Sequence, residues 1–259
     1  LPVASAPRRL AMRVIDEAAF DGAGRIEEVT LALDGSNGLI DLDVLLMTPR
    51  SLAGHAAPAV IAPNFCGNRA ALGFRYPEAS SPRWLAARCR TSLGRGATEI
   101  LHGDSIIRLP FADLLRAGYA VITYSPGELV PDDSSLASAA ILRLPLADSD
   151  GPRVGAIGAW AWSMSRIVDF ASADPHLDRD RIALFGHSRF GKAALLAAAL
   201  DPRIAAVIAN QSGRLGAAPS SDPMGEPLPS LLSHFPHWFP VEARAAAAQS
   251  ESLDQQLLL

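Results

Sequence analysis

The segment 181–192, RIALFGHSRFGK, constrains the fold of this chain more than any other. Ile182 to Phe185 has the apolar composition of an inner parallel strand, and the alanine- and leucine-rich segment 193–200 strongly favours a helix. Gly186 allows a sharp turn between them. Such a turn exposes the hydroxyl of Ser188 at the carboxyl edge of the sheet, where backbone N–H groups and a helix dipole stabilise an oxyanion. The segment therefore predicts a nucleophile for acyl transfer.

Composition narrows the possible functions. The 259 residues, of which 49% are hydrophobic and 19% charged, are enough to bury one sizeable core. The net charge of -4 offers no electrostatic argument for nucleic acid. No apolar run reaches the length of about 18 residues that a membrane span requires. We therefore expect neither nucleic acid nor a membrane as a partner, and Leu1 to Leu10 shows no export signal.

Cysteine and lysine are both rare in this chain. Cys66 and Cys89 are too few for a disulfide framework, and two free thiols are favoured over one loop-closing bridge. Of the 23 basic residues, 22 are arginine, and the single lysine is Lys192. Its place four residues after Ser188 indicates that a compact ammonium is needed beside the nucleophile, with chance as the alternative.

The rest of the chain predicts alternating strands and helices. Apolar segments at 26–33 and 39–47 flank the turn sequence DGSNG and predict an antiparallel hairpin. Inner strands are predicted at 59–62, 119–124 and 204–210. Helices are predicted at 110–117, at 157–168 with Trp160 in the core, and at the alanine-rich segment 243–248. Long surface loops are predicted at 69–107 and 125–153.

This alternation predicts an α/β fold of the α/β-hydrolase type, with a mostly parallel sheet covered on both faces. We divide the chain into an N-terminal segment, 1–25, and a partial α/β-hydrolase domain, 26–259, whose last strands we expect to be missing. The loop Pro63–Asn68 follows an inner strand, where such hydrolases place their second oxyanion donor; an ordinary loop is equally favoured. Among the acidic residues of 125–153 we single out Glu128, just past a strand end.

A serine hydroxyl becomes a good nucleophile only when a histidine removes its proton. His187 is adjacent to Ser188 but should point away from it, which favours a structural or oxyanion-side role. His234 and His237 lie in an aromatic segment and are minor candidates for a substitute base. Only one clear strand follows Ser188, so we expect the usual base, which follows two further strands, to be absent from this chain.

The nucleophile turn departs from G-x-S-x-G, because Phe190 replaces the second glycine, and matches G-x-S-R-x-G-K. Four further motifs accompany it: NFCGN at 64–68, GAIGAWAW at 155–162, IANQSG at 208–213 and FPHWF at 235–239. From about Val29 onward the chain thus resembles the glucuronoyl esterases of carbohydrate esterase family 15. The resemblance implies a secreted or periplasmic α/β-hydrolase, and we expect it to use no cofactor and no metal. It would cleave the ester between glucuronic acid on xylan and a lignin alcohol.

The resemblance also implies roles for individual residues. Ser188 would be the nucleophile, Arg189 an oxyanion stabiliser and Lys192 a contact to sugar hydroxyls. We add His187 and Trp238 as candidate substrate-binding residues. For Trp238 a sugar-facing position is slightly favoured over a core position, because prolines bracket it in a loop.

Two departures from the family pattern concern the catalytic set. Gln211 stands where some members carry the triad acid, and an amide cannot hold an imidazolium as a carboxylate does. The family histidine comes late, after a segment whose beginning 254–259 resembles. We therefore expect an esterase framework with only part of its catalytic set.

Three alternatives stay open at the level of sequence. The chain could be a catalytically incomplete carbohydrate-binding remnant, or an esterase of the acetylxylan type. Residues 186–193 are also one residue from the phosphate-binding loop G-x-x-x-x-G-K-[ST]. Ala193 cannot ligate Mg²⁺, however, so a nucleotide binder is the remote alternative.

Overall fold

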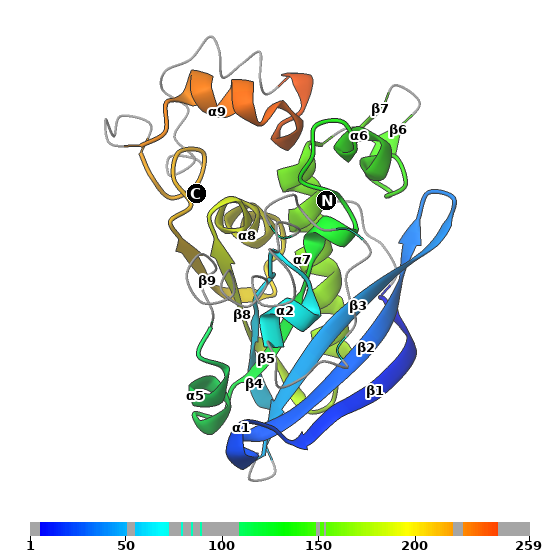
Figure 1. Cartoon of the computed structure of the whole chain (residues 1–259), viewed down its shortest axis with the longest axis vertical. Helices are drawn as coiled ribbons and strands as arrows, with labels where there is room; N and C mark the ends of the chain where they lie inside the picture. Colours follow the sequence, from blue (N-terminus) through cyan, green and yellow to red (C-terminus); the bar gives the residue numbers. More distant parts are fainter. Residues whose placement is uncertain are drawn as a thin grey trace.

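The computed structural model describes residues 6–50, 55–72, 79, 84, 89, 109–148, 151–152, 154–219 and 225–242. Its main sheet has seven strands in the order β1-β2-β3-β5-β4-β8-β9 (Figure 1). The strands are β1 (Arg8–Ala18), β2 (Gly24–Gly35), β3 (Gly38–Pro49), β4 (Ala57–Ile61), β5 (Ala120–Tyr124), β8 (Leu177–His187) and β9 (Ile204–Asn210). A separate ribbon pairs β6 (Ala147–Asp148) with β7 (Gly151–Pro152).

Helices and short helical turns connect these strands. The α-helices are α1 (Ala19–Gly22), α2 (Asn68–Leu72), α5 (Phe111–Arg116), α6 (Ala137–Ile141), α7 (Ala156–Ala173), α8 (Arg189–Leu200) and α9 (Leu228–His234). Two 3-10 turns are η1 (Pro126–Glu128) and η2 (Pro236–Trp238). Among the described helices, none combines the length and apolarity that crossing a membrane would take.

The sheet is mixed, with an antiparallel and a parallel half. β1, β2, β3 and β5 pair antiparallel in that order, and β5, β4, β8 and β9 run parallel. The predicted hairpin is confirmed, with Gly35 paired to Gly38 across a two-residue turn. The α/β-hydrolase-like class is confirmed, and the antiparallel half is larger than the sequence suggested.

Alternate residues of the central strands belong to two hydrophobic cores, one on each face of the sheet. Val44 and Leu46 of β3 belong to the core that α7 and α8 cover, whereas Leu45 and Met47 belong to the core that α2 and α5 cover. Because side chains alternate along a strand, this pattern requires a sheet buried on both faces. Trp160 of α7 is fully buried, which confirms its predicted core position.

Two predictions about loops and ends need correction. The segment 125–153 is not a plain polar loop, because it forms η1 and α6 and buries Leu129, Val130 and Ile141 in the core. Residues 8–18, for which we predicted no strand, form β1 at the edge of the sheet. Most of the predicted loop 69–107 and the predicted helix at 243–248 lie outside the described residues. The division of the chain at residue 25 stays a prediction.

Candidate active site

The turn between β8 and α8 holds Ser188 in a strained backbone conformation. Its φ of 54° and ψ of -124° lie in a region that glycine adopts readily and other residues rarely do. The Ser188 N–H donates to the Asn210 carbonyl of β9 at 2.9 Å. A Cβ on Gly186 would stand 2.2 Å from the Phe190 carbonyl oxygen, so only glycine fits there. The predicted sharp turn between strand and helix is thus confirmed, and the role of Ser188 as a nucleophile stays a prediction.

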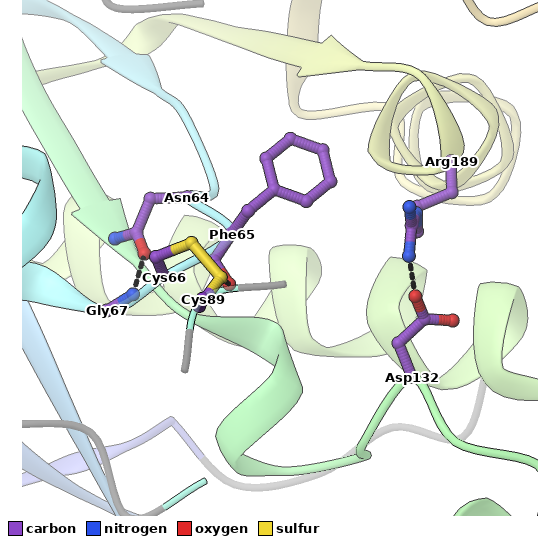
Figure 2. The surroundings of a disulfide bond; sticks show 7 residues. All are labelled: Asn64, Phe65, Cys66, Gly67, Cys89, Asp132 and Arg189. Atoms are coloured by element: carbon purple, nitrogen blue, oxygen red, sulfur yellow. Dashed lines mark hydrogen bonds and ion pairs between the residues drawn. A yellow bond between two sulfur atoms is a disulfide. The ribbon is translucent and has the colours of Figure 1, made fainter. Parts of the chain in front are cut away.

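Arg189, the first residue of α8, has a nearly buried side chain that is 10% exposed. Its guanidinium is ion-paired with Asp132 (Figure 2). The guanidinium carbon lies 5.4 Å from the centroid of the Phe65 ring and 5.3 Å from that of Trp238. The cation next to Ser188 thus lies against one carboxylate and two aromatic rings.

The carboxylate of Asp132 also accepts from two residues of η2. Its Oδ1 accepts from the Trp238 indole Nε1–H at 2.7 Å and from His237 Nε2 at 3.0 Å. Sequence reasoning missed Asp132 and singled out Glu128, which lies in η1. No local signal distinguishes Asp132 from its neighbour Asp133.

The two candidate substitute bases differ in their surroundings. His234 is exposed, and its Nδ1 lies 2.9 Å from the Ser230 carbonyl oxygen. His237 has a side chain only 6% exposed. Burial lowers its pKa below the ordinary histidine value, the charge of Asp133 opposes this, and Arg189 adds to it. Since a carboxylate only accepts, the neutral ring carries its proton on Nε2. Its buried Nδ1 has no hydrogen-bond partner among the described residues.

The loop after β4 packs against the turn that holds Ser188. Phe65 stacks on Phe190 with ring centroids 4.6 Å apart, and it meets the His187 ring edge-on at 6.0 Å. The side chain of Asn64 braces the loop, because its Oδ1 accepts from the Gly67 N–H at 2.7 Å. The predicted second oxyanion donor stays a prediction, and the loop does lie beside the turn that it would serve.

Cys66 and Cys89 form a disulfide next to Phe65, so the favoured prediction of two free thiols is wrong (Figure 2). Their Cα atoms are 5.6 Å apart, a separation that a disulfide spans. The two residues are 23 positions apart, and only folding brings them together. The bridge joins the Phe65 loop to a distant part of the chain.

Lys192 lies in the first turn of α8 and is 5% exposed. Its ammonium donates to the carbonyl oxygens of Ser212 and Arg214, which follow β9. Burial lowers the pKa of Lys192 to about 8, and the negative charge of Glu226 opposes that shift. In this structure the ammonium holds the loop after β9, and the predicted contact to sugar hydroxyls stays a prediction.

Trp238 lies in the interior and not on an open face. It is 4% exposed, and its indole stacks on Phe235 with centroids 4.0 Å apart. The slight preference for a sugar-facing indole is therefore corrected: the proline-bracketed segment forms η2, which packs inward against Gly155.

Of the other predicted residues, His187 bonds through Nδ1 to Asn210 Oδ1 at 2.7 Å, an arrangement suited to a structural role. The structure thus gathers Arg189 and Trp238 around Asp132, directly beside Ser188. In the part of the chain that the structure describes, no group of three or more His, Cys, Asp or Glu side chains could hold a metal ion.

Comparison with known proteins identifies relatives of this chain. The family model described as "Glucuronyl esterase, fungi" matches residues 101–221. A carbohydrate esterase of an unknown prokaryotic organism is 30% identical over 232 residues, which are 86% of this chain and 52% of that protein. A 4-O-methyl-glucuronoyl methylesterase of Phanerochaete chrysosporium is 40% identical over 104 residues, which are 39% of this chain and 22% of that protein.

A solved structure extends the similarity to the whole fold. A promiscuous family 15 carbohydrate esterase from a marine bacterial metagenome superposes with a TM-score of 0.72 at 26% identity. The match covers 96% of this chain and 64% of that one. The chain spans about half the length of the prokaryotic relative. The motifs, the family model, the curated relatives and this solved structure agree, and all of them point to the glucuronoyl esterases of carbohydrate esterase family 15 as the proteins that this chain resembles.

Proposed function

We propose that this chain belongs to a serine esterase that hydrolyses glucuronoyl esters, with Ser188 as the nucleophile. The observation that carries the proposal is the strained backbone of Ser188 at a strand-to-helix turn. Strain of this kind costs about 1–3 kcal/mol and persists where function requires it. It favours an enzyme over a carbohydrate-binding remnant, because a binding surface has no use for a strained serine.

In the proposed reaction, Ser188 Oγ attacks the ester carbonyl and gives up its proton to a general base. The carbonyl oxygen becomes an oxyanion, which the Arg189 backbone N–H and guanidinium would stabilise. Collapse of the intermediate expels the alcohol and leaves an acyl-enzyme, which water hydrolyses to the free acid and Ser188. We assign the base to neither described candidate, because His234 faces solvent and the Nδ1 of His237, the nitrogen left to accept a proton, is buried with no hydrogen-bond partner among the described residues, Ser188 included.

The proposed substrate is an ester of glucuronic acid, and more finely the link between xylan glucuronic acid and a lignin alcohol. The names of the relatives support the glucuronoyl ester. We further propose a secreted or periplasmic location. The Cys66–Cys89 disulfide supports it, because disulfides persist in oxidising compartments.

The test is an assay of the complete gene product on benzyl glucuronate and on acetylated xylan. We expect turnover of the glucuronate ester, and a loss of about 10³-fold or more in kcat for Ser188→Ala. Retained turnover in Ser188→Ala would overturn the nucleophile assignment, and preference for acetylated xylan would overturn the substrate.

Ser188→Gly gives a readout that does not depend on activity. It should remove turnover and yet raise the free energy of unfolding by about 1 kcal/mol or more, because glycine accepts a positive φ without strain. Ser188→Ala, which keeps the Cβ, is its matched control and should not stabilise the fold.

A further inference from the structure

We propose that Asp132 is a positioning residue, which holds the Arg189 guanidinium beside the nucleophile and fixes η2 to the same site. We call Asp132, Arg189, His237 and Trp238 the Asp132 cluster. The inference deepens the proposed function and rests on it for the catalytic part. Its structural part stands on the contacts of the cluster alone.

Three hydrogen-bond donors from two distant parts of the chain converge on the one carboxylate. Oδ2 pairs with the guanidinium of Arg189, while Oδ1 accepts from the indole of Trp238 and the imidazole of His237. The Asp132 side chain is 13% exposed, so water can replace few of these contacts. Arg189 begins α8, whereas the two aromatic donors belong to η2.

Only a carboxylate fits this position. Asparagine has the same shape, but it would offer one acceptor oxygen and turn an NH₂ group toward another donor. A nearly buried guanidinium facing a donor would lose its charge compensation and reorient. Asp132 therefore sets both the charge balance and the direction of the Arg189 side chain.

The two rings restrict the guanidinium further. Phe65 and Trp238 each lie within 5.5 Å of its central carbon, at 5.4 and 5.3 Å. Asp132 holds one of these rings directly through the indole N–H. Loss of the carboxylate would thus release the cation and one of its aromatic neighbours together. Since an oxyanion donor works only when it is preorganised, such a release should lower kcat more than it raises KM.

The experiment compares Asp132→Asn with Asp133→Asn in the complete gene product. The control, Asp133→Asn, removes the same charge one position away, where the carboxylate accepts hydrogen bonds from the backbone N–H and the hydroxyl of Ser135. We expect Asp132→Asn to lower kcat by about 10- to 100-fold with KM changed less than about threefold. Asp133→Asn should keep kcat within about twofold. Asp132→Glu, which retains the charge, is the milder second variant and should fall between the two.

A double-mutant cycle separates positioning from a direct role. If Asp132 acts through Arg189, Asp132→Asn should change kcat by less than about threefold in an Arg189→Ala background. Fully additive losses would overturn the proposal. So would an unchanged kcat in Asp132→Asn.

An NMR readout tests the cluster without any substrate. The Trp238 indole N–H resonance, assigned with Trp238→Phe, should move upfield in Asp132→Asn and stay in place in Asp133→Asn. An unmoved resonance refutes the cluster, whatever the activity. If the resonance moves but the parent protein does not hydrolyse benzyl glucuronate, the proposed function fails and the cluster stands.

Discussion

Gly155→Ala tests how closely the start of α7 and the η2 turn depend on each other. Gly155 precedes α7 with φ -85° and ψ -177°, which alanine adopts without strain. A Cβ there would lie 2.2 Å from the Trp238 carbonyl oxygen and 2.5 Å from the Phe239 nitrogen, although real Cβ atoms stay at 3.0 Å or beyond. Since both obstacles are backbone, η2 must move by about 1 Å.

This displacement should have two measurable effects. Overpacking of this kind costs about 1–3 kcal/mol, which for a chain of this size lowers Tm by roughly 3–10 °C. A shift of about 1 Å at Trp238 also moves a ring beside Arg189, and misplacement on that scale can cost about 10²-fold in rate. We therefore expect kcat on benzyl glucuronate to fall together with Tm, as measured by steady-state kinetics and thermal denaturation.

Gly118→Ala is the matched control for lost stability. Gly118 has φ +85° and nothing within 4 Å of an added Cβ, so alanine is strained there without displacing a neighbour. It should lower Tm through backbone strain and leave kcat unchanged. A Gly155→Ala protein with parental Tm and kcat would refute the close packing of η2 on α7.

Two further perturbations probe other parts of the site. Replacing both Cys66 and Cys89 by serine opens a loop of 23 residues and should lower the free energy of unfolding by about 3 kcal/mol in urea titrations. Dithiothreitol should cause the same loss in the parent and none in the double variant. A parent whose free energy of unfolding does not change on reduction would contradict the disulfide. In the folded protein the pKa of Lys192 is lowered to about 8, whereas in the unfolded chain it is about 10.4. Between these two pH values the Lys192 amine is protonated in the unfolded chain and neutral in the folded protein, so the stability of the fold increases as the pH rises. In urea titrations from pH 7.5 to 10, the free energy of unfolding of the parent should therefore rise by up to about 3 kcal/mol relative to that of Lys192→Met. A difference between the two proteins that does not change with pH would refute the lowered pKa.

Local patterns predicted the parts of the fold whose signal is local. The turn at Ser188 was predicted because a buried strand, a glycine and an apolar helix follow one another directly in the sequence. The helix α7 was predicted from the helical spacing of its apolar residues. The edge strand β1 was missed because neither of its faces is buried. Leu10 and Met12 are 52% and 53% exposed, and the strand is anchored partly by ion pairs from Arg9 to Asp174 and from Arg13 to Glu28.

The surroundings of Ser188 could not be predicted in the same way. Asp132 and Asp133 are adjacent and chemically identical. Only Asp132 forms the ion pair with Arg189 and accepts from η2, and this difference arises from the packing of the fold. For Trp238 a sugar-facing position was predicted because prolines bracket it, yet Pro236 begins the turn η2, which packs inward. Contacts between segments far apart in the chain leave no periodic trace in the sequence.

The order of the sheet has a consequence for folding kinetics. The β2–β3 hairpin closes over two residues, whereas β8 pairs with β4, where Val60 meets Ala183. Pairing of distant segments is slow, because loop-closure entropy is lost before the contacts form. The hairpin should therefore form early and the parallel half late. Because the Ser188 N–H bonds to Asn210 of β9, the strained serine is stabilised only once β9 has docked.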